Sequence, residues 1–387
     1  MSFLRRSPRY QDARPNLVLV GGGHSQVYVL DALAKDPMPD VRVTLIARDV
    51  LTPYSGMLPG YIAGHYTAAQ CHIDLEPLAH RAGAILVNDE AVGLDRDRGL
   101  VICQNGPPIP YDIVSLDIGS TPDLSGVPGA EALATPAKPV SMLRARWQAI
   151  LDRILREPGL FRFVTVGGGA AGVELTLAMR HRVRAFAKAH RRDPDDYEFA
   201  VVTAGELLED HNASVRRRFR RILKRRGVAF AENDPVRVVV DDHIACASGQ
   251  RFDFDELIWV TQAGGAPWLA DTGLELDRAG FVVVDACLQS VTDPRVLAAG
   301  DVASNRDHPR PKAGVFAVRQ GPPLAENLRR ALTLPPPPPF EPQREFLSLI
   351  STGNKYAVAS RGSWAAQGRF FWWLKDRIDR GWMRRWQ

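Results

Sequence analysis

Two glycine-rich turns constrain the fold of this chain more than any other feature. The first, Gly21–Gln26, lies between the apolar run Leu17–Val20 and a segment whose apolar residues recur at helical spacing. The second, Gly167–Gly172, lies between the apolar run Phe163–Val166 and another helical segment. A further apolar run follows each helical segment. Because strand, glycine turn, helix and strand form the unit of nucleotide-binding domains, the sequence predicts an α/β chain with two doubly wound, Rossmann-like domains.

The composition is that of a globular protein without membrane spans. The 387 residues are 45% hydrophobic and 24% charged, and the length allows two or three domains. No apolar run is long enough to cross a bilayer, and residues 1–16 lack the apolar core of a signal peptide, so we expect a cytoplasmic location. Four cysteines are too far apart for a zinc site, a disulfide scaffold or a redox pair, and we expect buried thiols and no metal at Cys71, Cys103, Cys246 and Cys287.

The second turn has the complete glycine pattern of a pyrophosphate-binding loop. Gly167 allows a tight turn, Gly169 lets the backbone approach a phosphate, and Gly172 allows close packing of helix on strand. The helix that starts near Ala170 would present unpaired N–H groups and the positive end of its dipole to the ligand. This turn is therefore predicted to bind a nucleotide, and Glu174 lies near the start of its helix.

The first turn departs from that pattern in its third position. Gly21 and Gly23 are present, but Gln26 replaces the glycine that packs helix on strand. The next strand ends without an acidic residue at the position that binds ribose, and Asp49 comes two places later. Two interpretations follow: a loop that binds nothing, or a second nucleotide site in which Arg48 faces the adenosine part of the ligand.

The strand after the second turn also ends without an acidic residue. It finishes at Val202–Gly205, and Glu206 is the nearest carboxylate. A carboxylate at that end usually binds the ribose 2′-hydroxyl of NADH. The sequence thus leaves three alternatives: NADPH, NADH held by other groups, or no nicotinamide ligand.

Together the two turns, the segment Tyr111–Ser120 and the pair Gly300–Asp301 resemble the two-dinucleotide-binding-domain flavoproteins, a pyridine nucleotide-disulfide oxidoreductase-like family. Within that family the chain is most similar to the branch of type II NADH dehydrogenases and sulfide:quinone oxidoreductases. The segment Thr52–Tyr66, with Gly21–Ser25, is similar to a subgroup in which some members are fused to selenophosphate synthetase. The resemblance extends from Asn16 to the C-terminus.

The resemblance implies two cofactors, FAD and NAD(P)H. The pyrophosphate of FAD would lie over the first turn, and Asp301 would accept a hydrogen bond from a ribityl hydroxyl. A helix near Ala313 would direct its N–H groups at the flavin and favour negative charge on it. The implied FAD contacts are Gly21, Gly23, His24, Ser25, Arg48, Tyr54, Ser55, Gly56, Ala91, Gly119, Gly300, Asp301, Ala313 and Gly314, and the expected NAD(P)H contacts are Gly167, Gly169, Ala170, Gly172 and Gly264.

The expected domain division follows from the same resemblance. We expect an FAD-binding domain in two parts, residues 1–125 and 266–334, with the NAD(P)-binding domain, residues 126–265, between them. Residues 252–261 have the pattern of a strand at the end of the second domain. Residues 335–387 are expected to contain a stiff linker, Pro335–Pro339, and a segment that contacts a membrane or a second subunit.

The C-terminal residues 369–387 have the pattern of an amphipathic helix with arginines opposite its apolar stripe. Tryptophan and arginine in this arrangement are typical of a helix lying in a membrane interface. The alternative is a helix docked on the core of the protein or on a second subunit of a homodimer. The stripe consists of Phe371, Leu374, Ile378, Trp382 and Trp386.

The arginine-rich segment Arg216–Arg226 has the pattern of another amphipathic helix, with Val215, Phe219 and Ile222 on one face. Nucleic-acid binding is one interpretation of such a charge run. The solvated face of a surface helix is the favoured interpretation, because nothing else in the sequence indicates nucleic-acid recognition. We therefore expect no nucleic-acid partner.

The expected function is that of an FAD-dependent oxidoreductase, peripheral on the inner face of the cell membrane. NAD(P)H is expected to pass a hydride to the flavin, and a quinone to take the electrons near Phe316 and Gln320. Glu174 and Gln320 are the expected catalytic residues. Two alternatives stay open: a flavoenzyme acting on a sulfur or selenium compound through a cysteine at the flavin, and a non-catalytic flavoprotein scaffold.

Overall fold

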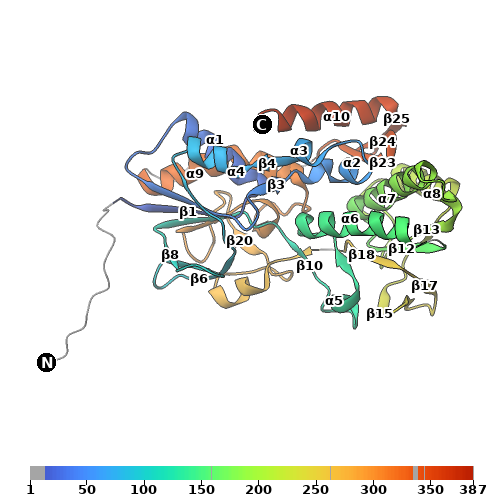
Figure 1. Ribbon diagram of the computed structural model, residues 1–387. Coiled ribbons are helices and arrows are strands. Elements are labelled where there is room, and N and C mark those ends of the chain that lie inside the picture. Colours follow the sequence, from blue (N-terminus) through green and yellow to red (C-terminus); the bar gives the residue numbers. More distant parts are fainter. Residues whose placement is uncertain (1–13, 158, 262, 334–338, 344, 387) are drawn as a thin grey trace. The chain divides into compact units, whose positions relative to one another are not determined.

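The computed structural model describes residues 14–157, 159–261, 263–333, 339–343 and 345–386 (Figure 1). The chain forms two compact units, and each has a parallel sheet of its own. The expected proline linker lies, apart from Pro339, outside the described residues. The first unit comprises Met1–Val50, Leu75–Gly119 and Pro267–Pro342, and the second comprises Leu51–Asp74, Ser120–Ala266 and Gln343–Gln387.

A five-stranded parallel sheet in the order β21–β9–β1–β2–β5 forms the centre of the first unit. Its middle strand is the first apolar run, which is buried because a parallel sheet is covered on both faces. Helix α1 packs against both α4 and α9 (Figure 1). The elements are β1 (Asn16–Val20), α1 (His24–Lys35), β2 (Arg42–Ile46), α4 (Leu75–Arg81), β5 (Ile85–Val87), β9 (Ile113–Leu116), β21 (Val296–Ala298) and α9 (Gly314–Thr333).

Short sheets and turns complete the first unit. Strands β6, β7 and β8 form an antiparallel sheet, and β20 pairs with β22 in parallel. The turn η4 directly follows β21, so Gly300–Asp301 lies at the carboxyl end of a parallel strand, where open α/β sheets bind their ligands. The elements are β6 (Ala91–Asp95), β7 (Leu100–Cys103), β8 (Ile109–Pro110), η3 (Pro267–Thr272), β20 (Val282–Val284), η4 (Gly300–Val302) and β22 (Ala303–Asn305).

A second five-stranded parallel sheet, in the order β11–β18–β12–β13–β14, forms the centre of the second unit. Phe163 of β12 packs with the cluster that includes α6, α7 and α8, whereas Val164 belongs to the cluster on the opposite face. Phe163 also stacks on Phe199, with 4.7 Å between the ring centroids. The elements are β11 (Thr135–Pro136), α6 (Val140–Arg156), β12 (Phe161–Val166), α7 (Ala170–Ala189), β13 (Tyr197–Val202), α8 (Ala213–Arg225), β14 (Val228–Ala231) and β18 (Glu256–Trp259).

The strand expected over residues 252–261 is divided in two, which corrects that prediction. The first part, β17, pairs antiparallel with β16, and the second part, β18, joins the parallel sheet beside β12. Asp255 stands between the two, and its carboxylate accepts the N–H of Arg162 at 2.8 Å. The chain therefore changes sheets there, which hydropathy alone does not reveal. The antiparallel elements are β15 (Val236–Val240), β16 (His243–Cys246) and β17 (Arg251–Asp253). The second unit also contains α5 (Ala130–Leu133), η2 (Pro194–Asp196) and the antiparallel pair of β10 (Thr121–Pro122) and β19 (Ala263–Gly264).

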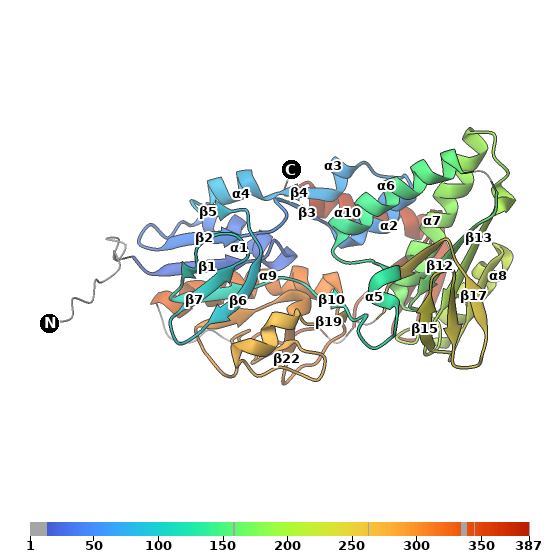
Figure 2. The same ribbon diagram turned by 60° about the horizontal axis from the view of Figure 1, so that its bottom comes forward.

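Two segments far apart in sequence belong to the second unit (Figure 2). Residues 51–74 form a short hairpin with helical turns, and residues 348–383 form an antiparallel sheet that leads into α10. Two unit boundaries fall at 119/120 and 266/267. The expected division into an FAD-binding and an NAD(P)-binding domain stays a prediction. The elements are β3 (Leu51–Pro53), η1 (Ser55–Met57), α2 (Leu58–Ile62), α3 (Ala68–Cys71), β4 (His72–Asp74), β23 (Ser348–Thr352), β24 (Asn354–Arg361), β25 (Trp364–Gly368) and α10 (Arg369–Met383).

The two units confirm the expected fold class, with two Rossmann-like parallel sheets and a C-terminal helix. None of the helices in the described part of the chain is long and apolar enough to span a membrane. Within the same residues there is no group of three or more histidine, cysteine or acidic side chains that could hold a metal ion.

Candidate functional site

The first glycine-rich turn joins β1 to α1. Gly21 has a φ of +97°, and a Cβ atom there would lie 2.4 Å from the backbone oxygen of Asp117. A Cβ atom at Gly23 would lie 2.1 Å from Asp117 Cγ. Asp117, at the end of the neighbouring strand β9, therefore requires both glycines, whatever the turn binds. His24 and Ser25 follow as the first residues of α1.

Gln26 takes over the packing role of the missing third glycine. Its side chain is fully buried, and Nε2 donates to the carbonyl oxygens of Ser115 at 2.7 Å and Val20 at 3.3 Å. The side-chain amide therefore ties α1 to β9 and β1. The departure from the usual glycine pattern leaves the strand–turn–helix geometry intact.

Asp117 is a buried carboxylate that sequence analysis missed. Its side chain is 3% exposed, and Oδ2 accepts the N–H groups of Ser25 at 2.9 Å and Gln26 at 3.1 Å. Burial raises the pKa of Asp117 to about 7, and the charge of Asp301 acts in the same direction. The carboxylate thus satisfies N–H groups at the start of α1, where negative charge is favoured by the helix dipole. The only sequence signal was an acidic residue in the mostly apolar run before Gly119.

Gly300 brings the turn after β21 to the same place. Its φ is +71°, and a Cβ atom there would lie 2.4 Å from Asp117 Oδ1. Its N–H donates to Oε1 of Gln320 at 2.7 Å. Gln320, expected to be catalytic, therefore holds this turn from α9. The glycine turn, Asp117 and the Gly300 turn converge within the first unit.

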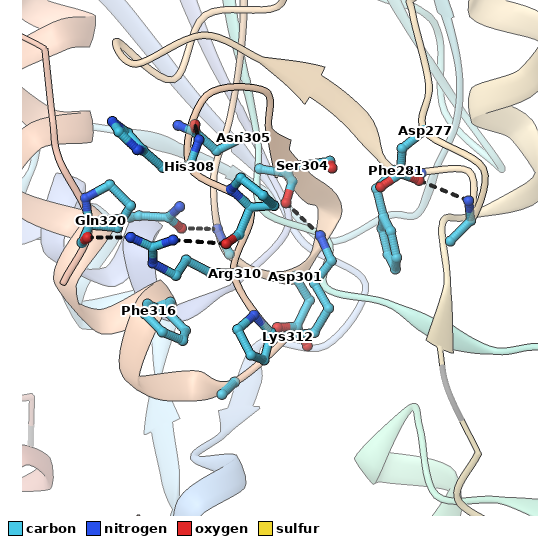
Figure 3. A pocket seen from close by; sticks show the side chains of 17 residues that line it. Asp277, Phe281, Asp301, Ser304, Asn305, His308, Arg310, Lys312, Phe316 and Gln320 are labelled. Atoms are coloured by element: carbon cyan, nitrogen blue, oxygen red, sulfur yellow. Dashed lines mark hydrogen bonds between the residues drawn. The ribbon is translucent and has the colours of Figure 1, made fainter. Parts of the chain in front are cut away.

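A cavity of about 220 Å³ opens beside the Gly300 turn (Figure 3). Asp301, Lys312, Phe316 and Gln320 contribute to its wall, together with Ala313, and Gly314 begins α9 beside it. The Lys312 ammonium lies 3.9 Å from the ring centroid of Phe281 and donates to the carbonyl oxygen of Ala303 at 2.6 Å. Burial lowers the pKa of Lys312 to about 8. The wall thus combines aromatic, cationic and acidic side chains, a set suited to a flat ligand with polar edges.

The second glycine-rich turn joins β12 to α7. Gly167 has a φ of +127°, and a Cβ atom there would lie 2.3 Å from the backbone oxygen of Val260. A Cβ atom at Gly172 would lie 2.0 Å from the oxygen of Gly167. In contrast, Gly169 is exposed, and a Cβ atom there would meet no atom within 4 Å. No side chain caps α7, which begins at Ala170, and its first turn has no acidic residue, so this helix N-terminus is open to an anion.

The loop after β13 lies against this second turn. The N–H of Leu208 donates to the oxygen of Gly168 at 2.8 Å. Glu206, the nearest carboxylate, is paired with Arg216 and Arg220 of α8. Arg220 also binds both carboxylate oxygens of Glu232, at 2.6 and 2.7 Å. Two arginines of the basic helix thus have acidic partners within their own unit.

Glu174, on the first turns of α7, belongs to a buried polar cluster. Its carboxylate accepts the N–H of Ser351. Burial raises the pKa of Glu174 to about 7, although the nearby charge of Lys375 acts in the opposite direction. Lys375 of α10 donates to Asp379 at 2.9 Å and to the carbonyl oxygen of Gly56 at 2.8 Å. The cluster therefore joins α7, the segment after β3 and α10.

Tyr54 extends this cluster. Its hydroxyl donates to Asp379 at 3.2 Å, and its ring stacks on Trp382 with 4.3 Å between centroids. Ser55 begins η1 directly after it. The segment expected to contact FAD, Tyr54 to Gly56, is thus tied to α10 within the second unit. Sequence analysis missed Lys375 and Asp379, which lie within the predicted C-terminal helix.

The other predicted cofactor residues lie outside these clusters. Arg48, after β2, pairs with the exposed Glu90 at 3.1 Å. Ala91 begins β6. Gly119 has a φ of +74° with no atom within 4 Å of its Cβ position, and Gly264 lies in the short strand β19. Glu90 is a carboxylate next to Arg48 that the sequence pattern did not reveal.

The solvent-exposed face of α10 differs from the predicted stripe. Trp382 and Trp386 are buried, whereas Phe370 and Trp373, which lie outside the stripe, are 60% and 51% exposed. Ile378, a residue of the predicted stripe, is 50% exposed. The buried ridge of the helix includes Asp379, Trp382 and Met383, because the polar cluster and the stacked Tyr54 ring lie on that side.

The four cysteines are free, and three of them are buried. Burial raises the pKa of the Cys71 thiol to about 12 and also raises that of Cys287, the less buried one. Thiolate formation, on which sulfur chemistry depends, is therefore disfavoured at Cys71 and Cys287.

A comparison with known families gives the class of the protein. The sequence profile of the pyridine nucleotide-disulphide oxidoreductases matches residues 15–321, which include both glycine-rich turns and the Gly300–Asp301 turn. The chain belongs to this family. Membership confirms the expected oxidoreductase class and its cofactors, FAD and NAD(P)H.

The chain is similar to relatives named as NADH dehydrogenases or NADH dehydrogenase-like proteins. The chain is 24% identical over 267 residues to a protein of Dictyostelium discoideum named "Probable NADH dehydrogenase", a match that covers 64% of this chain and 58% of that one. It is 23% identical to the NADH dehydrogenase-like protein YutJ of Bacillus subtilis, covering 74% and 76% of the two chains. These matches confirm the resemblance to the NADH dehydrogenase branch.

Solved structures agree on the fold. NDH2 of Plasmodium falciparum, solved in complex with NADH, superposes with a TM-score of 0.80 at 14% identity and covers 96% of this chain and 97% of its own. The sulfide:quinone oxidoreductase of Aquifex aeolicus superposes with a TM-score of 0.78 at 17% identity, covering 95% and 90%.

The residues of the two units suit the cofactors of the family, with one exception. The cradle at Gly21 and Gly23 and the cavity beside Asp301 suit FAD, and the open N-terminus of α7 suits a nicotinamide nucleotide. The exception is Asp117, whose carboxylate has the same sign of charge as a pyrophosphate and accepts N–H groups at the start of α1.

Proposed function

We propose that the protein oxidises NAD(P)H and passes the electrons through FAD to a quinone-type acceptor. When bound, FAD supplies the exchange between two-electron donor and acceptor. The proposed oxidation of NAD(P)H is supported by one observation. The exposed Gly169 precedes α7, whose N-terminus has no side-chain cap, so a pyrophosphate can bind the backbone N–H groups there. Holding the nicotinamide in position is the main task of these residues, since hydride transfer needs no protein nucleophile.

The proposed transfer of electrons to a quinone is supported by the cluster around Glu174. Reduction of a quinone to a quinol consumes protons, and a carboxyl whose pKa is raised to about 7 holds a proton near neutral pH. Lys375 and Asp379 fix the surroundings of Glu174 by hydrogen bonds and charge. We therefore assign Glu174 the role of proton donor to the acceptor, and Gln320 that of holding the Gly300 turn at the cavity.

The exposed face of α10 supports contact with a membrane surface. Phe370, Trp373 and Ile378 are each at least half exposed, and Arg377 lies over the Trp373 ring at 5.8 Å. Large aromatic side chains beside arginine are favoured at the lipid–water interface. In our proposal this face rests on the inner surface of the cell membrane, where a lipid-soluble quinone is available.

The acceptor is tested by reoxidation of the reduced protein. Protein reduced anaerobically by NADH or NADPH is mixed with a soluble short-chain quinone, and the return of flavin absorbance is followed. We expect fast reoxidation by the quinone and none by a disulfide. Reoxidation by ferricyanide but by no quinone would contradict the acceptor, and flavin reduction by sulfide in place of NAD(P)H would favour the sulfur alternative.

A further inference from the structure

The two glycine-rich turns of this chain are built alike but differ in one charge. At Gly21 the atom nearest to a Cβ would be the backbone oxygen of Asp117, and at Gly167 it would be that of Val260, at 2.4 and 2.3 Å. Asp117 and Val260 thus occupy equivalent places at the end of the neighbouring strand. The second turn has an apolar side chain there, whereas the first has a carboxylate.

The carboxylate of Asp117 accepts N–H groups that an anionic ligand would otherwise bind. It accepts the N–H groups of Ser25 and Gln26 at 2.9 and 3.1 Å, and Gly23 and Gly300 are packed against it without room for a Cβ. N–H groups at the start of such a helix are those that a dinucleotide pyrophosphate normally binds.

The strongest charge effect on Asp117 comes from another acidic side chain. From η4 the carboxylate of Asp301 acts on it and disfavours its ionisation. On α1, His24 is the first helical residue and precedes Ser25. Strand β1 contains no titratable side chain, and α9 contributes Gln320, which accepts the N–H of Gly300. The charge of Lys312 interacts with that of Asp301.

We propose that Asp117 couples the binding of FAD to the uptake of a proton. The carboxyl is ionised in the FAD-free protein above neutral pH, and it is protonated once a pyrophosphate lies beside it. Protonation removes the repulsion between two anions and converts an acceptor into a donor that can face a phosphate oxygen. The inference rests on the FAD-binding part of the proposed function.

The direction of the pH dependence follows from linkage. Asp117 has a pKa of about 7 without the ligand, and the charge of the pyrophosphate raises it further. Below about pH 7 the carboxyl is already protonated, and the affinity for FAD is independent of pH. Above that value binding requires a proton, so the dissociation constant rises by up to about tenfold for each pH unit.

The experiment measures FAD binding to the apoprotein by quenching of flavin fluorescence, from about pH 6 to about pH 9. Proton uptake is measured in the same titration with an indicator dye in weakly buffered solution. We expect weaker binding as pH rises, with close to one proton taken up per FAD at about pH 8 and almost none at about pH 6. Asp117→Asn is expected to give a flat profile without proton uptake.

The second turn provides a matched control in the same molecule. Binding of NAD⁺ at Gly167–Gly172, where Val260 replaces the carboxylate, is expected to take up no proton. A flat FAD profile without proton uptake in the wild type would overturn the inference while leaving FAD binding in place. Absence of FAD binding at every pH, with NAD⁺ binding retained, would instead contradict the proposed function. Because the wild-type measurement is decisive, the test does not depend on the folding of the variant.

Discussion

The atoms next to each glycine show whether the fold requires that glycine or whether it is available to a ligand. Gly21, Gly23, Gly167 and Gly172 are all required by a neighbouring atom that a Cβ would strike. Gly169 is not, and its backbone angles of −69° and 177° are open to any residue. A glycine motif in a sequence therefore contains glycines required by the packing of the fold and glycines required by a ligand. The surrounding atoms of the structure show which glycine is of which kind.

Substitutions at Gly172 and Gly169 of the second turn should distinguish a glycine required by the fold from one required by a ligand. Gly172→Ala places a Cβ 2.0 Å from the oxygen of Gly167, and we expect a loss of roughly 1–3 kcal/mol in the free energy of unfolding. Gly169→Ala should leave the melting temperature unchanged but weaken nicotinamide nucleotide binding by about tenfold, because the added Cβ would keep a phosphate away from the backbone N–H groups and weaken a hydrogen bond to it. Thermal unfolding and equilibrium titration measure the two effects. Equal loss of stability in both variants would contradict this assignment.

Glu174 should give the acceptor reaction its pH dependence. Its carboxyl holds a proton below about pH 7 and loses it above, so we expect reoxidation of reduced flavin by quinone to slow as pH rises through that value. Glu174→Gln should remove this dependence and slow reoxidation at acidic pH by about a hundredfold. Glu174→Asp, which keeps the carboxyl, is the control and should retain a pH-dependent rate. Flavin reduction by the nicotinamide should be unaffected in both variants. An unchanged pH profile of reoxidation in Glu174→Gln would exclude Glu174 as the proton donor.

At the scale of elements, the sequence predicts helices and strands better than the faces they bury. The start of α10 at Arg369 is predicted correctly, but its stripe is not, because the buried ridge is selected by Tyr54 and the charged pair Lys375–Asp379. Tyr54 lies far away in sequence, and a helical pattern contains no information on which partner packs against it. The strand pattern of residues 252–261 fails for a similar reason, since the chain changes sheets at Asp255.

The exposed face of α10 should carry the affinity for membranes. Replacing Phe370 and Trp373 by serine should lower binding to anionic phospholipid vesicles by more than about tenfold, because both side chains would leave the interface. Leu160→Ser is the matched control, since Leu160 is a 47% exposed apolar residue outside this face. Co-sedimentation with vesicles measures the difference. Unchanged sedimentation together with a loss of dimer mass in the double variant would show that the face contacts a second subunit.

At the scale of the whole molecule, the order of motifs predicted two Rossmann-like sheets and the family, because strand–glycine–helix units are local in sequence. Asp117 escaped prediction because its hydrogen-bond partners, Ser25 and Gln26, come from a helix near the N-terminus. Residues 51–74 and 343–387 likewise belong to one unit although they are far apart in sequence. A pattern that is local in sequence does not predict this association.

The central claim is that a nicotinamide nucleotide reduces a flavin held by this protein. The most direct measurement is anaerobic rapid mixing of the purified, flavin-loaded protein with NADH and, separately, with NADPH, following the visible absorbance of the flavin. We expect rapid bleaching by at least one of the two nucleotides, and at limiting nucleotide we expect it to be about tenfold slower in Gly169→Ala. A flavin that stays oxidised with both nucleotides would contradict the account.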